Sequence, residues 1–189
     1  DKECHIIEQY TRAFNYPAEN RVKTIADLPK LGIKTYFCSN VCAAYQMEIY
    51  NRLDGFVDSA IFNEDMLYAA QVIEAGYGIA YAADAKVIHS HNYSFRQQLR
   101  RNFDLAVSQA EHPEVFADVP SEREGIRMVK QTMRYLRDSK KAYLIPELVM
   151  QSAGKYLGYQ LGKHYKLLPM TLVRKLTMNQ AYWDRREID

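Results

Sequence analysis

The sequence lacks several features that would place it in a class at once. It has no run of 18 apolar residues, so it predicts no segment that spans a membrane. Its three cysteines, Cys4, Cys38 and Cys42, form no C-x-x-C pair and leave an odd count. That usage favours free thiols in a reducing compartment over a disulfide framework, and buried thiols over a metal pair. We therefore expect a cytoplasmic protein.

Phosphate-binding and nucleic-acid-binding signatures are also missing. No Asp-x-Asp triplet and no glycine-rich phosphate loop occur in the 189 residues, and Gly76 and Gly78 stand alone. The basic residues are dispersed and follow no nucleic-acid-binding motif, so nucleic acid is a poor candidate for a partner. What remains is the composition of a folded protein with one domain and an appendage.

Charge is distributed unevenly along the chain. Residues 1–121 carry 11 Lys and Arg against 16 Asp and Glu, a net charge of −5, whereas residues 122–189 carry 14 against 7, a net charge of +7. Proline residues punctuate the chain near the change of sign, at Pro113 and Pro120. We expect a domain boundary there, with 1–116 as one part and 117–189 as a basic, mostly helical part.

The most informative stretch runs from residue 63 to residue 91. Apolar residues at helical spacing predict a helix that Asn63 caps, with Glu64 and Asp65 in its first turn and Gly76 at its end. Residues 78–81 and 85–88 are typical of short strands, and the second would carry His89 and His91 at its end.

This arrangement would bring acids and imidazoles to one rim. Paired carboxylates with histidines suit proton abstraction, metal ligation or both. The alternative is ordinary, because acids in the first turn of a helix are favoured by the helix dipole without any ligand.

Other elements are expected on either side of this stretch. The pattern predicts a helix over 5–14, a short helix or turn over 25–32, and a strand over 34–38. A helix over 41–50 would follow, capped by Ser39 or Asn40. Residues from about 100 and most of the chain beyond 122 are expected to be helical.

Several motifs in order resemble the acceptor half of a family 2 glycosyltransferase, and more narrowly a bacterial rhamnosyltransferase of that family. The resemblance covers the chain to about Phe116 and is carried by Phe37-Cys38-Ser39-Asn40, Gly55-Phe56, Asn63-Glu64-Asp65, Gly76-Tyr77, Tyr81–Ala85 and His89-Ser90-His91. It implies an α/β fold, a partial Rossmann-like mixed sheet of the GT-A type without its nucleotide-binding half.

The resemblance also implies roles for individual residues. Asp65 would be the base that deprotonates the acceptor hydroxyl, and Glu64 would shape the acceptor pocket beside Ser39 and Asn40. His91, or with less support His89, would complete the ligand set of Mn²⁺ or Mg²⁺ beside the missing Asp-x-Asp.

A phosphate role is expected for one further residue. Arg101 would meet a phosphate, although a solvated helix face is the more common fate of such an arginine.

The implied reaction is inverting transfer of rhamnose from a dTDP-rhamnose-like nucleotide sugar to a glycan or lipid-linked acceptor. Because the donor half is missing, we expect this chain to be a fragment that does not catalyse transfer alone. Two alternatives stay open. One is a non-catalytic module that binds acceptor or membrane, and the other is a metal-dependent hydrolase that uses Glu64, Asp65 and the histidines.

The basic tail suggests a surface partner. Over 154–178, leucines and tyrosines recur every three to four residues between lysines and arginines, and Pro169 should kink the run or split it into two helices. Such a segment suits peripheral contact with the inner face of the membrane. Packing on its own domain, or on a second copy in a homo-oligomer, is the equal alternative.

Overall fold

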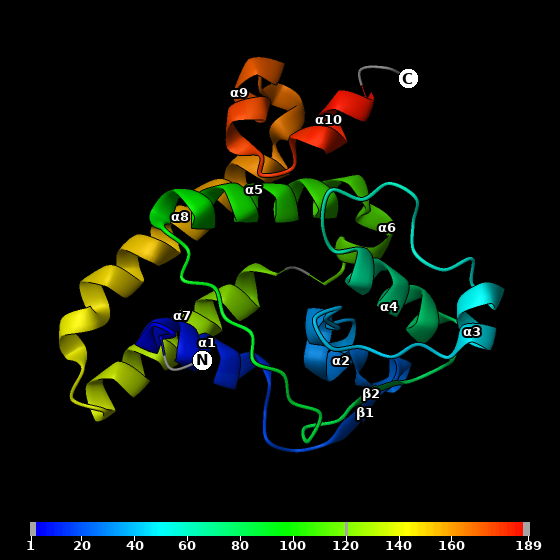
Figure 1. Ribbon diagram of the computed structural model, residues 1–189, viewed down its shortest axis with the longest axis horizontal. Coiled ribbons are helices and arrows are strands. Elements are labelled where there is room, and N and C mark those ends of the chain that lie inside the picture. The colour runs from blue at the N-terminus through cyan, green and yellow to red at the C-terminus, as the bar shows by residue number, and fades with distance from the viewer. Residues whose placement is uncertain (1–2, 120, 187–189) are drawn as a thin grey trace. The chain divides into compact units, whose positions relative to one another are not determined.

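The structure, a computed structural model, describes residues 3–119 and 121–186. It is mostly helical and contains one two-stranded sheet, consistent with a mixed α/β fold (Figure 1). The chain forms two compact units that interleave in sequence, and each is described separately. No described helix has both the length and the apolar character needed to cross a bilayer.

The first unit takes up the chain to Asp58, Asn63–His91 and Val115–Ser121. Its helices and strands, in order, are α1 (Ile6–Asn15), β1 (Arg21–Lys23), η1 (Ile25–Asp27), α2 (Leu28–Leu31), η2 (Gly32–Thr35), α3 (Met47–Arg52), α4 (Glu64–Glu74) and β2 (Ile79–Tyr81). Strands β1 and β2 pair antiparallel, with Arg21 opposite Tyr81 and Lys23 opposite Ile79.

Helix α4 begins and ends where the sequence predicts. Asn63 occupies the N-cap position with a left-handed backbone, φ 63°, and Glu64 and Asp65 stand in the first turn. The helix ends in a Schellman motif, because Gly76 N–H donates to Ile73 O at 3.1 Å and Tyr77 N–H donates to Val72 O at 3.0 Å. Gly76 has φ 85°, a conformation that glycine adopts without steric cost.

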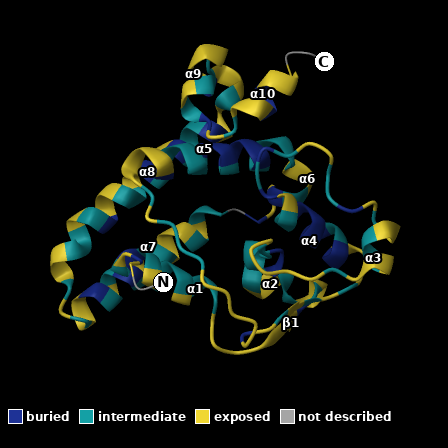
Figure 2. Cartoon of the chain, viewed as in Figure 1, coloured by how far each residue is buried: buried dark blue, intermediate teal, exposed yellow. Residues whose placement is uncertain are grey.

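The core of the first unit forms on the inner face of α4. Ala70 and Ile73 are fully buried there and cluster with Tyr36 and Val119. The partly buried side chains packed on this cluster are Leu28, Ile33, Met66, Ile79 and Val115. Figure 2 shows α4 as mostly buried. Its N-terminal turn, with both carboxylates, is thereby held on a rigid element.

Three predicted elements of this unit are wrong. Residues 34–38 are not a strand, the helix expected from residue 41 starts only at Met47, and residues 85–88 have no regular structure. Strand formers need a neighbouring strand, and β2 pairs with β1 instead. Asn40 caps no helix because its polar groups bind the carboxylates at the start of α4.

The second unit takes up Ser59–Phe62, Asn92–Glu114 and the chain from Glu122 onward. Its helices are α5 (Phe95–Glu111), α7 (Glu122–Asp138), η3 (Ala142–Leu144), α8 (Ile145–Lys163), η4 (Tyr165–Leu167), α9 (Met170–Leu176) and α10 (Gln180–Arg186). The short α6 (Pro113–Phe116) spans the division between units. The expected split between α8 and α9 at Pro169 is confirmed. The two units are defined by packing and interleave in sequence, so they do not test the boundary expected at 116/117, which stays a prediction.

Glycines bring α8 very close to α5. Gly154, Gly158 and Gly162 recur every four residues, are buried, and face α5, which lies alongside (Figure 1). A Cβ added to Gly158 would lie 2.0 Å from Leu99 O, and one added to Gly162 would lie 2.3 Å from Phe103 O. The backbones of the two helices therefore approach to a distance that only glycine permits.

A buried carboxylate ties the α9–α10 connection to α5. Asp104 accepts hydrogen bonds from Thr177 Oγ1 at 2.6 Å and from Met178 N–H at 2.7 Å. Arg100 donates to Thr177 O at 2.9 Å through Nε. Burial raises the pKa of Asp104 to about 6, and the two hydrogen bonds oppose that rise.

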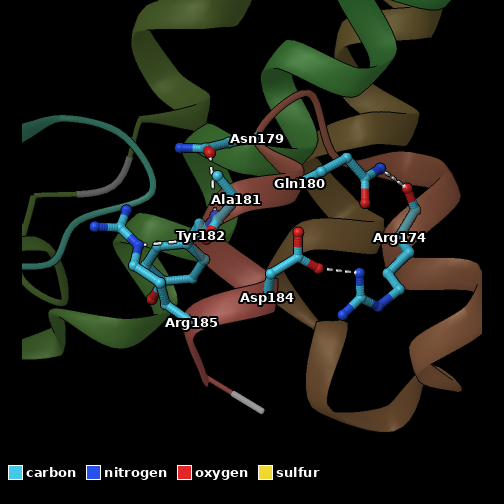
Figure 3. Close-up of polar contacts among 7 residues, drawn as sticks. All are labelled: Arg174, Asn179, Gln180, Ala181, Tyr182, Asp184 and Arg185. Atoms are coloured by element: carbon cyan, nitrogen blue, oxygen red, sulfur yellow. Dashed lines mark hydrogen bonds and ion pairs between the residues drawn. The ribbon is translucent and has the colours of Figure 1, made fainter. Parts of the chain in front are cut away.

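Helices α9 and α10 also hold each other. Arg174 Nη1 lies 2.5 Å from Asp184 Oδ1, and Gln180 donates to Arg174 O (Figure 3). Beneath them lies the core of this unit, formed by Ile61, Phe103, Val107, Val173, Tyr182 and Trp183. The helical tail is therefore packed on α5 along much of its length.

The close contact between α5 and α8 gives the first prediction. Gly158→Ala should lower the free energy of unfolding by about 1–3 kcal/mol, because the new methyl group meets backbone that cannot rotate away. Gly125→Ala in α7 is the matched control, since its Cβ would have no neighbour within 4 Å. That control should stabilise by about 1 kcal/mol through helix propensity. Urea unfolding measures both, and equal stabilities would contradict the packing.

Asp104 gives the second prediction. Its native pKa of about 6 exceeds the unfolded value of roughly 3.9, so the native state binds more protons between these values. The free energy of unfolding should therefore fall as pH rises from about 4 to about 6, by up to about 3 kcal/mol from this group. Asp104→Asn should lack that slope when both proteins are unfolded in urea at pH 4–7.5. An unchanged slope in the variant would assign the effect to other carboxylates.

Candidate functional site

A groove of about 1330 Å³ lies within the first unit. It runs past α1, the residue 37–46 loop, the start of α4 and the loop that follows β2. Asp65, Ser39, Tyr45 and His89 are among the residues that line it. The sequence-predicted acid and one predicted imidazole therefore border the same groove.

Asn40 holds both carboxylates of α4. Its backbone N–H donates to Asp65 Oδ2 at 3.3 Å, and its side-chain amide donates to Glu64 Oε1 at 3.2 Å. Asp65 Oδ1 accepts a further bond from Met66 N–H at 2.8 Å. Three residues that the sequence predicts for one site, Asn40, Glu64 and Asp65, thus come together. Ser39 lines the groove beside them, and its carbonyl accepts Cys42 N–H at 3.3 Å.

Tyr45 fixes the orientation of the Asn40 amide. Its hydroxyl donates to Asn40 Oδ1, which leaves the amide nitrogen directed at Glu64. The chain of donors therefore runs from Tyr45 through Asn40 to Glu64. Burial raises the pKa of Tyr45, so its hydroxyl keeps its proton and remains a donor at neutral pH.

Asp65 has the electrostatics of a proton acceptor. Burial raises the pKa of its carboxyl, the negative charge of Glu64 raises it further, and hydrogen bonds from Asn40 and Met66 oppose the rise. A carboxylate with a raised pKa accepts a proton more readily than an exposed one. Glu64 is exposed, so the two acids have different environments although they are adjacent.

A buried lysine supports the loop that carries Asn40. Lys23 on β1 is 7% exposed, and its Nζ donates to Lys34 O at 3.1 Å and to Phe37 O. Burial lowers the pKa of Lys23 to about 8. Its neighbour Cys38 is not an activated nucleophile, because burial and the charge of Asp65 raise the pKa of that thiol.

Four aromatic rings pack beside the carboxylates. Tyr45, Tyr50, Phe56 and Tyr68 all contact one another, with ring centroids 5.2–6.2 Å apart. Gly55 makes room for them, since a Cβ there would lie 2.5 Å from the Tyr50 ring. We call these four residues the aromatic cluster.

The two histidines expected as metal ligands lie in the loop after β2, not at the end of a strand. Their rings meet edge to face, with centroids 4.4 Å apart. Much of this loop is exposed (Figure 2), including Ile88, which is 86% exposed. Within the described ranges, no three His, Cys, Asp or Glu side chains come close enough to hold a metal ion.

Arg101, the expected phosphate ligand, belongs to α5 in the second unit. Its guanidinium lies over the Phe62 ring at 4.6 Å and near the Tyr93 ring at 5.7 Å. These cation–π contacts give the side chain a packing role within its own unit.

Sequence reasoning missed Tyr45, Lys23 and the aromatic cluster. A signal existed for the cluster, because five aromatic residues, the four of the cluster and Phe62, fall within residues 45–68 around the Gly55 turn. No signal existed for Lys23, whose partners lie 11 and 14 residues away and are backbone carbonyls.

Comparison with known proteins supports one resemblance. The chain is 40% identical over 184 residues to an O-antigen chain rhamnosyltransferase of Salmonella typhimurium, covering 97% of this chain and 58% of that protein. It is 42% identical over 176 residues to an O-antigen chain rhamnosyltransferase of Salmonella anatum, covering 93% and 56%. No protein-family model and no solved structure matches it.

The chain spans somewhat more than half the length of these curated relatives. Over most of its own length, this chain is rhamnosyltransferase-like in sequence.

Proposed function

We propose that this chain is the acceptor-side part of an inverting glycosyltransferase of the GT-A type that transfers rhamnose to a growing cell-surface polysaccharide. The observation that carries the proposal is the carboxylate pair of α4, held by Asn40 at the edge of a large groove. The similarity to two O-antigen chain rhamnosyltransferases supports the sugar and the kind of product.

Asp65 acts as the base in this proposal. An acceptor hydroxyl loses its proton to Asp65 Oδ as its oxygen attacks the anomeric carbon of the donor. The bond from that carbon to the nucleoside diphosphate breaks, and the diphosphate leaves with the electron pair. Two hydrogen bonds hold the carboxylate in place before the substrate arrives, so little reorganisation is needed during reaction.

A divalent cation, Mn²⁺ or Mg²⁺, belongs to the same proposal. It would neutralise the charge of the leaving diphosphate. His91 or His89 would contribute an imidazole. The remaining ligands would have to come from elsewhere, because no three His, Cys, Asp or Glu side chains among the described residues could hold a metal ion together. The nitrogen donors of this chain therefore fit such a site only in part.

The donor in this proposal is a nucleotide sugar of the dTDP-rhamnose type, and the acceptor is a glycan or a lipid-linked glycan. Arg101 remains the candidate phosphate ligand. The competing function is a non-catalytic module that binds the acceptor or the membrane and transfers no sugar.

The third prediction tests the base. In an active enzyme of the relatives' length that contains this chain, Asp65→Asn should lower the turnover rate ~10²–10⁴-fold, as loss of a positioned base does. Donor binding, measured by calorimetry with the nucleotide sugar, should not change. Glu64→Gln is the matched control, because it removes the neighbouring charge and leaves Asp65 in place. It should lower turnover far less.

Release of nucleoside diphosphate in the presence of acceptor measures turnover in both variants. Near-normal release by Asp65→Asn would remove the base role. Acceptor binding without any release by the unaltered enzyme would favour the non-catalytic module.

We further propose that the second unit makes peripheral contact with the inner face of the membrane. The contact would lie at η4 and α9, where Leu167 is 83% exposed and Met170 is 43% exposed. Exposed lysines flank them at Lys163, Lys166 and Lys175. Apolar side chains within a basic rim suit an anionic bilayer surface, and a lipid-linked acceptor would require one.

The fourth prediction tests this contact. The triple variant Lys163→Glu, Lys166→Glu and Lys175→Glu should lose sedimentation with vesicles that contain anionic lipid, since each basic residue adds roughly 1 kcal/mol near such a surface. Leu167→Asp should weaken binding at any salt concentration. The control is the exposed pair Lys130→Glu and Lys140→Glu, which lies away from η4 in sequence. If salt does not change vesicle binding, the membrane contact is wrong, and the apolar residues of this surface serve packing or self-association instead.

A further inference from the structure

The aromatic cluster presents one face to the groove. Of its four rings, only Tyr45 and Tyr68 are among the described residues that line the groove. Tyr68 is 3% exposed, so it lies behind, whereas Tyr45 is only partly buried. The ring that the groove offers to a ligand is therefore that of Tyr45.

This ring is held rigidly. Phe56 and Tyr68 contact Tyr45 nearly edge to face, with interplanar angles of 86° and 71°. At its far end, the hydroxyl is tied to Asn40 Oδ1. A ring fixed at both ends loses little conformational freedom when a ligand binds, so it is preorganised as a platform.

Polar groups lie immediately beside the platform. Asn40 joins the Tyr45 hydroxyl to Glu64 and Asp65. Of these two carboxylates, Asp65 lines the groove with Tyr45, and the adjacent Glu64 is exposed to solvent. Ionised carboxylates only accept hydrogen bonds, and two of them offer several acceptor positions. A ligand for this area needs an apolar face next to a rim of hydroxyl donors.

We propose that Tyr45 is the floor of a subsite for a neutral pyranose, with the C–H face of the sugar on the ring and its hydroxyls donating to Glu64 and Asp65. A pyranose has such a face and such a rim. A uronic or other anionic sugar is disfavoured, because it would place a third negative charge beside the two carboxylates. That this sugar is the acceptor rests on the proposed function, whereas its binding to Tyr45 does not.

The Tyr45 hydroxyl holds Asn40, whereas the Tyr45 ring would contact the sugar, and substitutions distinguish these two roles. Tyr45→Phe keeps the platform and frees the Asn40 amide, whereas Tyr45→Leu removes the platform. Phe56→Leu is the matched control, since it removes a ring of the same cluster that does not line the groove. Any binding change due only to loosening of the cluster would appear in Phe56→Leu as well.

The experiment uses the 189-residue chain and needs no donor. Methyl glycosides of rhamnose, galactose and mannose, with glucuronate as the anionic probe, are titrated at millimolar concentrations and followed by saturation-transfer and chemical-shift NMR. We expect at least one neutral glycoside to bind with its ring C–H signals shifted upfield by the aromatic face. Tyr45→Leu should weaken that binding about tenfold, a typical loss for one aromatic contact. Phe56→Leu should stay within about threefold of the unaltered chain. Tyr45→Phe, which keeps the ring but loses its hydrogen bond to Asn40, should fall between Phe56→Leu and Tyr45→Leu.

Three results would overturn the proposal. They are no binding of any neutral glycoside by a chain that circular dichroism shows to be folded, equal binding by Tyr45→Leu, and glucuronate binding as tight as that of the neutral sugars. None of them depends on catalysis. A subsite found here in a protein without transferase activity would leave this inference standing and would sink only the proposed function.

Discussion

The site depends on the contact between Asn40 and the first turn of α4. Two adjacent carboxylates repel each other, and they stay close to one loop because Asn40 donates to both, by its backbone to Asp65 and by its side chain to Glu64. Two other residues support this contact. Tyr45 orients the amide, and Lys23 holds the preceding loop through Phe37 O.

This arrangement gives two neighbouring acids different chemistry. Glu64 is exposed, while partial burial and the charge of Glu64 raise the pKa of Asp65. Pairs of carboxylates whose environments differ in this way are typical of sites that move protons. The same edge, with Tyr45 beside it, offers both a proton acceptor and a platform for a sugar, which is why the proposed reaction and the proposed subsite meet at one place.

The second unit depends on a different constraint, which is that α8 carries glycine wherever it faces α5 most closely. Three glycines at intervals of four residues let α8 lie against the backbone of α5. The apolar residues of 154–178 divide into two groups, one packed on the core of the unit and one exposed to solvent. Leu161, Tyr165, Leu168 and Leu176 pack on the core of this unit, while Leu167 and Met170 remain exposed. A helical pattern alone does not distinguish these groups, because both give apolar residues every three to four positions.

The sequence by itself determined the local elements whose signals are local. Helix α4, its acidic first turn and its end at Gly76 follow from apolar residues at helical spacing and from a glycine that tolerates positive φ, although the Asn63 side chain makes no capping hydrogen bond. Helix α1, strand β2 and the break at Pro169 also follow from local patterns in the sequence. The motifs around Asn40, Glu64 and Asp65 also predict one site from the sequence alone.

Only the tertiary structure decided how distant residues meet. Residues 34–38 have strand-forming side chains but no strand beside them, so they form a 3₁₀ turn and a loop. Asn40 has the side chain of a helix cap, yet it binds carboxylates 24 and 25 positions away, an option that no local pattern records. Lys23 is buried because two backbone carbonyls accept its protons, and Tyr45 reaches the groove because three other rings support it. Such contacts depend on which surfaces the folded chain brings together, and local propensity carries no information about them.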